Sequence, residues 1–301
     1  MRKKRTVPVL ITGDVDPTPE VTVENKKKSL RRTLALFGEF GIKATFFCVA
    51  RSAEQLGPEI EKIVQNGHEI GCHGLTHGFE EEYDKMPEVM QREYLQSATG
   101  ILETLAGHQI VSFRGPRVKT SHVTQGILEE LGYRADSSVC SQRVDFVSSN
   151  LINAGWIFAP RFPYHPHEAS PYKRGDRKLW VVPLSAIVLP FVSGIAYTLG
   201  YNYSKALFDL LYRESIRTGK PIVYLFHPVE FAPNTEKVEK RFSFKNIAVE
   251  GFRFRRSSWL FEQDEKKKYE QNRALFAYMS SFPDVRLMTV REYVRTQDND
   301  V

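Results

Sequence analysis

The alternation of apolar and amphipathic segments constrains the fold of this chain more than any other feature of its sequence. Short apolar runs predict strands over 7–13, 43–49, 68–72, 110–115, 133–138, 178–188, 221–227 and 285–290. Helical patterns among them predict helices over 24–40, 53–67, 86–106, 120–132, 203–218 and 264–281. Strands and helices at this spacing form parallel βα units whose helices cover the sheet, so we expect an α/β protein.

The number of repeats indicates a barrel, because about seven βα units in one chain favour a closed or nearly closed sheet. The 301 residues, 42% of them hydrophobic, are enough for one large core, and no linker or internal repeat divides them. We therefore expect a single domain over residues 1–301. Two segments interrupt the alternation: 141–177 is expected to be an inserted loop, and 232–262 a hairpin of alternating basic and aromatic residues.

Composition argues against several classes of protein. Lys and Arg number 42 against 36 Asp and Glu, and this net charge of +6 is too mild for a dedicated nucleic-acid-binding surface. No segment reaches the roughly 18 apolar residues of a membrane helix. Cys48, Cys72 and Cys140 are odd in number and lack CxxC spacing, which favours a reducing compartment. We expect a cytoplasmic protein, and the apolar run after MRKKR predicts a strand rather than a signal peptide.

Two aspartates follow the first predicted strand. In TGDVDP, Asp14 and Asp16 stand two residues apart, so their side chains project to the same side of a strand. The carboxyl ends of the strands carry the active sites of βα barrels. Two carboxylates there repel each other unless a cation or an arginine lies beside them. The alternative is that either residue only forms a turn before Pro17.

Two histidines follow the third predicted strand in GHEIGCHGLTH. Four residues apart, His73 and His77 would face the same way on a helical turn, within reach of one cation. Such a pair alone is weak evidence for a metal. Cys72 is expected to point away from His73 as a buried hydrophobe, and His68 to be structural.

Ionisable residues also follow three later strands: Arg114 in FRGPR, Asp136 in YRADSS and His227 in LFHP. Each has an ordinary alternative, since Arg114 could be a solvated charge and His227 a buried structural histidine. Their joint occurrence with the aspartates and histidines at five strand ends predicts one site on the rim of the barrel.

The order of these motifs resembles the polysaccharide deacetylase family, also called the NodB-homology group or carbohydrate esterase family four. DVD, GHEIGCHGLTH, FRGPR, ADSS and LFHP occur in the family's order, and GIKATFFCVA is similar to its second strand. The resemblance covers roughly residues 7–230, and its motif style is closest to the intracellular peptidoglycan-deacetylase-like branch. It implies a distorted, incomplete (β/α) barrel with seven strands, similar to a TIM barrel.

The resemblance also implies a role for each residue at a matching position. Asp16, His73 and His77 would bind one divalent metal ion, with Zn²⁺ the first choice and Co²⁺ or Mn²⁺ the alternatives. Asp14 would be the general base, and Arg114 would orient it.

On the other side of the site, the resemblance makes His227 the general acid and Asp136 the residue that orients it. The backbone N–H of Arg117 would stabilise the oxyanion, and Leu225 would line the pocket for the acetyl methyl group. Two positions depart from the family pattern. Gly74 stands where the extracellular branch has Ser or Thr, and the Trp that often follows the aspartate of ADSS is absent.

These inferences predict a metal-dependent hydrolase that removes the acetyl group from an N-acetylated amino sugar or its conjugate. One alternative is hydrolysis of a cyclic amide, as in allantoinase-like and imidase-like relatives, which tend to lose the metal residues. Another is a non-catalytic barrel that binds carbohydrate, which would be expected to have lost the base or the acid. A homo-oligomer is also open, as are the roles of His165 and His167 and of a basic face, including Arg253 and Arg255, in 232–262.

Overall fold

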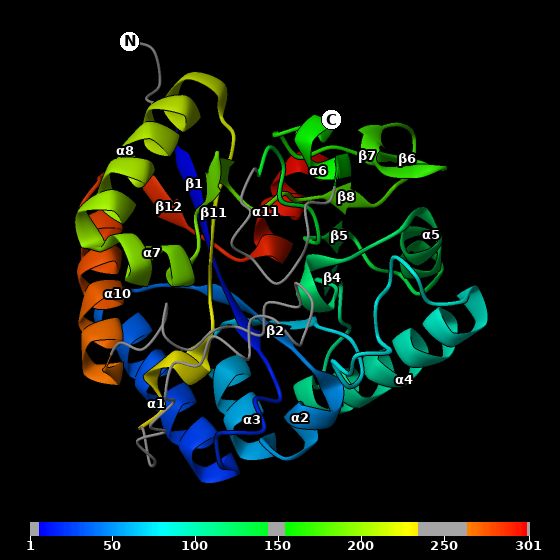
Figure 1. Ribbon diagram of the computed structural model, residues 1–301, viewed down its shortest axis with the longest axis horizontal. Helices are drawn as coiled ribbons and strands as arrows, with labels where there is room; N and C mark the ends of the chain where they lie inside the picture. The colour runs from blue at the N-terminus through cyan, green and yellow to red at the C-terminus, as the bar shows by residue number, and fades with distance from the viewer. Residues whose placement is uncertain (1–5, 144–153, 234–263, 300–301) are drawn as a thin grey trace, which may run out of the picture.

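The computed structural model describes residues 6–143, 154–233 and 264–299, and its centre is a curled parallel sheet of eight strands (Figure 1). Seven strands follow the order β11-β1-β2-β3-β4-β5-β8, and β12 pairs with the first residues of β1. The strands are β1 (Val7–Val15), β2 (Ala44–Cys48), β3 (Glu69–Cys72), β4 (Ser112–Phe113), β5 (Ala135–Asp136), β8 (Trp180–Val181), β11 (Ile222–Phe226) and β12 (Val285–Leu287). The predicted distorted, incomplete barrel is confirmed.

Helices cover the outer face of this sheet (Figure 1). They are α1 (Val23–Glu39), α2 (Ala50–Glu54), α3 (Gly57–Gln65), α4 (Glu88–Ala106), α5 (His122–Glu130), α7 (Ser193–Leu199), α8 (Tyr201–Thr218) and α10 (Glu265–Ser280). The helix predicted over 53–67 is two helices, because Pro58 in the first turn of α3 starts a new helix after a break at Leu56. A last helix, α11 (Val290–Asn299), follows β12 where we had predicted only a strand.

The barrel stays incomplete between β8 and β11. The single strand predicted over 178–188 breaks after Val181, because Pro183 has no N–H to continue the ladder. The chain then forms a small antiparallel pair, β9 (Ala186–Ile187) and β10 (Leu189–Pro190). This irregular segment spans the gap, and Leu225 N donates to Phe191 O at 3.3 Å.

The alternation of side chains along the strands produces two apolar cores. Val9 and Ile11 of β1 point to the helices and belong to the outer core, whereas Leu10 points into the barrel. Inside the barrel, Leu10 packs in a cluster that includes Leu225 and is closed by Tyr293 of α11. The strands are thus anchored on both faces, which holds their carboxyl ends in fixed positions.

The segments that interrupt the alternation are described only in part. The expected loop 141–177 contains α6 (Ala154–Phe158) and the short antiparallel strands β6 (Pro166–His167) and β7 (Ser170–Arg174). The hairpin expected over 232–262, including Arg253 and Arg255, lies outside the described residues from 234 onward. Among the described helices, none has both the length and the apolar character needed to cross a membrane.

Candidate metal and catalytic site

The end of β1 carries both aspartates to the rim of the barrel. Thr12, Asp14 and Asp16 alternate with residues of the outer core, so all three face the inner side, as expected from their spacing. Asp14 is 3% exposed, and its Oδ1 accepts a hydrogen bond from Arg114 Nη1 at 2.7 Å. Asp16 follows the last residue of the strand and lies beside three imidazoles.

Asp16, His73 and His77 form a group in which one ligand atom of each residue lies within 4.8 Å of the others. Asp16 Oδ1 is 3.4 Å from His73 Nε2 and 3.8 Å from His77 Nε2. The structure therefore brings together the three residues that we predicted as metal ligands. Their role as ligands stays a prediction.

The protonation pattern of this group suits a cation. His73 Nδ1–H donates to the carbonyl oxygen of Arg114 at 2.6 Å, which leaves the Nε2 lone pair toward Asp16. Asp16 Oδ1 is buried and has no hydrogen-bond partner among the described residues. Burial raises the pKa of Asp16, but its contact with His73 and the charges of His227 and His77 outweigh this effect and hold the pKa well below its usual range. One carboxylate and two imidazoles match the protein ligands of catalytic zinc sites.

The two histidines are brought together by a loop, and our expectation of a helical turn is wrong. Residues 73–77 follow β3 without helical structure, and both Gly74 (φ +81°) and His77 (φ +61°) have left-handed backbone conformations. At Gly74 a Cβ atom would collide with the carboxylate of Glu81. This collision explains why glycine stands where Ser or Thr is usual in the extracellular branch.

Glu81 organises this loop and was missed by the sequence analysis. Its buried carboxylate accepts hydrogen bonds at 2.7 Å from each of the consecutive backbone N–H groups of Leu75, Thr76 and His77. Tyr83 OH adds a fourth at 2.9 Å. In the sequence, Glu81 sits in the run EEE, which is typical of a solvated surface, so only the fold reveals its role.

Arg114 is fully buried, which excludes the solvated charge that we had kept as an alternative. Its Nη1 donates to Asp14 Oδ1 at 2.7 Å and to Thr12 Oγ1 at 3.0 Å. Its Nε and Nη2 donate to Ser137 O at 3.2 Å and Ser137 Oγ at 2.9 Å. The guanidinium thus holds one oxygen of Asp14, while Asp14 Oδ2 lies 3.8 Å from His73 Nε2, facing the predicted metal ligands.

His227 follows β11 and faces the same group, as predicted, rather than the apolar core. Its Nε2 lies 3.7 Å from Asp16 Oδ2, and its Nδ1 lies 3.2 Å from Glu230 Oε1. Glu230 was not among the predicted site residues, although the spacing His-Pro-Val-Glu is visible in the sequence.

The predicted contact between Asp136 and His227 is not among the hydrogen bonds of the described residues. Asp136 Oδ2 accepts from Thr120 Oγ1 at 2.9 Å and from Gln125 Nε2 at 3.0 Å. Its Oδ1 accepts from the backbone N–H of Ser138 at 2.9 Å and from the Ser138 hydroxyl. Among the described residues, none of its hydrogen bonds reaches His227, because the carboxylate turns toward the segment that follows β4.

That segment contains Arg117, whose N–H we predicted to stabilise the oxyanion. Asp136 holds it through Ser138, whose Oγ accepts from the backbone N–H of Gly115 at 2.8 Å. Arg117 and Val118 both have positive φ, +57° and +58°. The Arg117 guanidinium donates to the carbonyl oxygens of Gly78 at 2.8 Å and Glu81 at 3.0 Å, so this turn is tied to the His77 loop. The roles of the Arg117 N–H and of Leu225 stay predictions.

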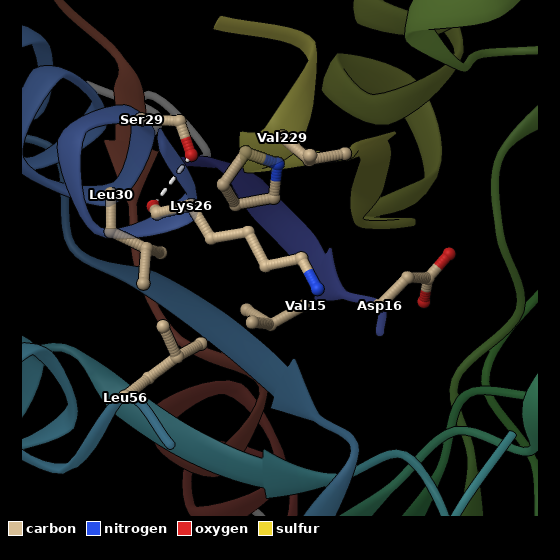
Figure 2. Close-up of a pocket in the computed structure, with 8 residues that line it drawn as sticks. Val15, Asp16, Lys26, Ser29, Leu30, Leu56 and Val229 are labelled. Carbon is tan, nitrogen blue, oxygen red and sulfur yellow. Dashed lines mark hydrogen bonds between the residues drawn. The ribbon is translucent and has the colours of Figure 1, made fainter. Parts of the chain in front are cut away.

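Behind Asp16, on the side of α1, lies a small cavity of about 10 Å³, enough for roughly one water molecule (Figure 2). Lys26 extends along it toward Val15 and Asp16, and its Nζ donates to the carbonyl oxygen of Pro17. This contact fixes the backbone directly after Asp16. The cavity is too small for a sugar, so a substrate would have to approach from the side of the imidazoles.

Three of the other histidines, His68, His165 and His167, differ in their surroundings. His68 packs against Phe37 and Phe46, and burial lowers its pKa to about 4, in line with the structural role we expected. His165 stacks on Trp180 at the start of β8, which is the end of the strand away from the rim. His167 is exposed on β6. Cys72 lies in the outer core, as expected.

Residues 3–135 match the family model described as polysaccharide deacetylase. The chain resembles this family over less than half of its 301 residues. It is 32% identical over 110 residues to a peptidoglycan deacetylase-like protein, FGM2, from Gibberella zeae (36% of this chain, 32% of that protein). It is 28% identical over 108 residues to a peptidoglycan deacetylase from Helicobacter pylori (36% of each chain). The chain thus spans about a third of the length of each of these relatives in the alignments.

Solved structures share the fold over nearly the whole chain. A polysaccharide deacetylase homologue from Mycobacterium smegmatis has a TM-score of 0.64 at 18% identity, covering 99% of this chain and 93% of its own. PuuE allantoinase has a TM-score of 0.62 at 16% identity, covering 99% and 92%. At these identities the likeness establishes the distorted barrel fold, and the fold alone.

Proposed function

We propose that this chain belongs to the polysaccharide deacetylase family and is a metal-dependent hydrolase that removes the acetyl group from an N-acetylated amino sugar or its conjugate. The observation that carries this proposal is the convergence of one aspartate and two imidazoles with a second, buried and arginine-bound aspartate on one rim. The family match supports the reaction class, and the names of the two peptidoglycan deacetylase relatives support a polymer of N-acetylated sugars as one substrate to test.

Asp16, His73 and His77 would hold the ion, for which we propose Zn²⁺ because imidazole and carboxylate ligands suit it, with Co²⁺ or Mn²⁺ as alternatives. A divalent ion bound there would lower the pKa of a water molecule and polarise an amide carbonyl. The hydrogen bond from His73 Nδ1–H to Arg114 O fixes the imidazole for this role.

We propose that Asp14 accepts the proton of the attacking water. Arg114 occupies its Oδ1, so Oδ2 is the oxygen that faces the predicted ligands, 3.8 Å from His73 Nε2. The hydrogen bond from Arg114 would also prevent the Asp14 carboxylate from rotating toward a bound cation and becoming a ligand. A base held in one orientation beside the nucleophile is what general-base catalysis requires.

We propose that His227 donates a proton to the departing nitrogen. An amine leaves poorly as an anion, so amide hydrolysis depends on an acid on the leaving-group side. His227 comes from β11 and Asp14 from β1, neighbouring strands whose ends flank Asp16. The N–H of Arg117 is proposed to stabilise the oxyanion, and Leu225 to contact the acetyl methyl group.

Acetate release tests this proposal. Chelated protein would be reloaded with Zn²⁺, Co²⁺ or Mn²⁺ and supplied with N-acetylglucosamine, triacetylchitotriose, UDP-N-acetylglucosamine, peptidoglycan fragments, allantoin and hydantoin. We expect metal-dependent acetate from at least one N-acetylated sugar and no ring opening of the cyclic amides. Ring opening without acetate would favour the allantoinase-like alternative, and binding of sugars without turnover would favour a carbohydrate-binding barrel.

A cytoplasmic location remains our proposal, supported by three cysteines that are all buried free thiols.

A further inference from the structure

Glu230 stands three residues after His227, in the 3₁₀ turn Pro228–Phe231 that follows β11. In a 3₁₀ turn the side chains of residues i and i+3 lie one above the other. The turn is closed by a hydrogen bond from Glu230 N to His227 O at 2.9 Å. The local backbone therefore places a carboxylate directly against the imidazole, with Glu230 Oε1 3.2 Å from His227 Nδ1.

We propose that Glu230 is the positioning residue for His227 and takes the part that the family resemblance assigns to Asp136. The proposal rests on the proposed function in one respect, namely that His227 is the general acid. The contact between the two side chains is independent of that assumption.

The contact decides which ring nitrogen faces the reaction. A carboxylate that accepts the Nδ1–H hydrogen bond fixes the orientation of the ring. Nε2 is then the atom that faces the site, and it lies 3.7 Å from Asp16 Oδ2.

Glu230 is itself held by two further elements. Ser193 Oγ, in the first turn of α7, donates to Oε1 at 2.8 Å, and Tyr197 OH donates to Oε2 at 2.7 Å. Asn272 of α10 in turn donates to Tyr197 OH at 2.6 Å. Burial raises the pKa of Glu230. The hydrogen bond and charge of His227, together with the hydrogen bonds from Tyr197 and Ser193, outweigh the effect of burial, so the pKa of Glu230 lies below its usual range. The group is therefore a fixed carboxylate.

Asp136 has no capacity left for this role. Its Oδ2 accepts hydrogen bonds from Thr120 and Gln125, and its Oδ1 accepts from Ser138. Through Ser138, Asp136 supports the turn that contains Arg117. The two carboxylates thus hold different parts of the rim: Asp136 holds the proposed oxyanion turn, and Glu230 holds the proposed acid.

A spectroscopic test needs no substrate. In zinc-loaded protein with ¹⁵N-labelled histidine, the Nδ1–H resonance of His227 would be assigned by its loss in His227→Gln. In Glu230→Gln we expect it to move upfield or broaden through exchange with water, whereas in Asp136→Asn it should stay in place. The reverse pattern, with the resonance unchanged in Glu230→Gln and lost in Asp136→Asn, would overturn the proposal.

A kinetic test separates positioning from general damage. An amide such as triacetylchitotriose needs an acid, whereas 4-nitrophenyl acetate releases a stable phenolate without one. For Glu230→Gln we expect kcat on the amide to fall about 10²-fold, with KM little changed and a loss on the ester at least about tenfold smaller. Equal losses on both substrates would show a merely structural role and overturn the proposal.

Tyr197→Phe provides a second variant in case Glu230→Gln folds poorly. It removes one donor to Glu230, so we expect a smaller loss with the same preference for the amide. If the wild-type protein hydrolyses no amide at all, the proposed function fails, and the resonance of His227 still decides whether Glu230 positions it.

Discussion

Two carboxylates hold the two histidine-bearing segments of the rim, and they do so in different ways. In the loop after β3, Glu81 accepts hydrogen bonds from the backbone N–H groups of Leu75, Thr76 and His77. In the turn after β11, Glu230 accepts one from the side chain of His227. The first carboxylate fixes where a proposed metal ligand stands, and the second fixes how a proposed acid is turned.

Glu81 and Glu230 should therefore affect different properties of the site, one the affinity for the metal and the other the rate of turnover. A disturbance of Glu81 moves the backbone that carries His77, so metal affinity should suffer. A disturbance of Glu230 leaves Asp16, His73 and His77 in place, so the ion should remain bound while turnover falls.

The largest effect on the metal side is expected from removal of a ligand. His77→Ala leaves one imidazole and one carboxylate, and we expect zinc affinity measured by isothermal titration calorimetry to fall by more than the roughly 100-fold typical of losing a supporting contact. His68→Ala is the matched control, because His68 is buried among aromatic rings away from the ligands. Equal affinity in His77→Ala and the wild type would exclude His77 as a ligand.

The largest effect on the chemical side, with the ion retained, is expected from Asp14→Asn. The amide keeps the hydrogen bond from Arg114 but cannot accept the proton of water, so acetate release should fall about 10²- to 10⁴-fold. Zinc affinity should change little, because the predicted ligand group does not include Asp14. Loss of zinc with turnover preserved would mean that Asp14 and Asp16 have exchanged roles.

Glu81→Gln should weaken zinc binding by about 10- to 100-fold, because one oxygen of the carboxylate must be replaced by an amide group that cannot accept the loop's N–H bonds. At saturating zinc, kcat on an N-acetylated sugar should return to within a few-fold of the wild type. Glu80→Gln is the control, since Glu80 is the exposed neighbour. If Glu81→Gln lowers kcat at saturating zinc as much as Glu230→Gln does, the two carboxylates do not have separate effects on zinc affinity and turnover.

The smallest effect is a dependence of zinc affinity on pH. Burial lowers the pKa of His73, but Asp14 and Asp16 raise it more, so its pKa lies above the usual 6.5. Protonated His73 cannot bind a cation, so affinity should fall as pH drops through this raised pKa, by up to about tenfold per pH unit. Asp14→Asn removes one source of the shift, so in calorimetric titrations at several pH values its fall should begin at lower pH. An unchanged profile would contradict this explanation.

The sequence was sufficient for the parts of the site that depend on strand periodicity. Asp14 and Asp16 share a side because residues two apart do so on any strand, and parallel strands bring Arg114 and His227 to the same rim. The buried run of β1 and the glycine-terminated helices were equally visible. These features depend on local pattern, and local pattern is what a sequence shows directly.

Features set by contacts between distant or irregular segments were not predicted. The fit between Gly74 and Glu81 depends on the path of a loop, and the partner of His227 depends on a turn that follows β11. The helix α11 was missed although Thr289 and Glu292 form a capping box, whose side chains accept from each other's backbone N–H. The alternation of apolar residues in β12 had suggested that the strand continued.

We propose that Asp16, His73 and His77 bind one divalent ion, whereas Asp14 and His227 do not bind it and instead transfer protons. An anomalous difference map, recorded at the zinc edge from crystals grown with Zn²⁺, tests it most directly. We predict one strong peak per rim site at about 2 Å from Asp16, His73 and His77, with Asp14 still bound to Arg114 and His227 still bound to Glu230. No peak at this position, or a peak coordinated by Asp14 in place of Asp16, would contradict the account.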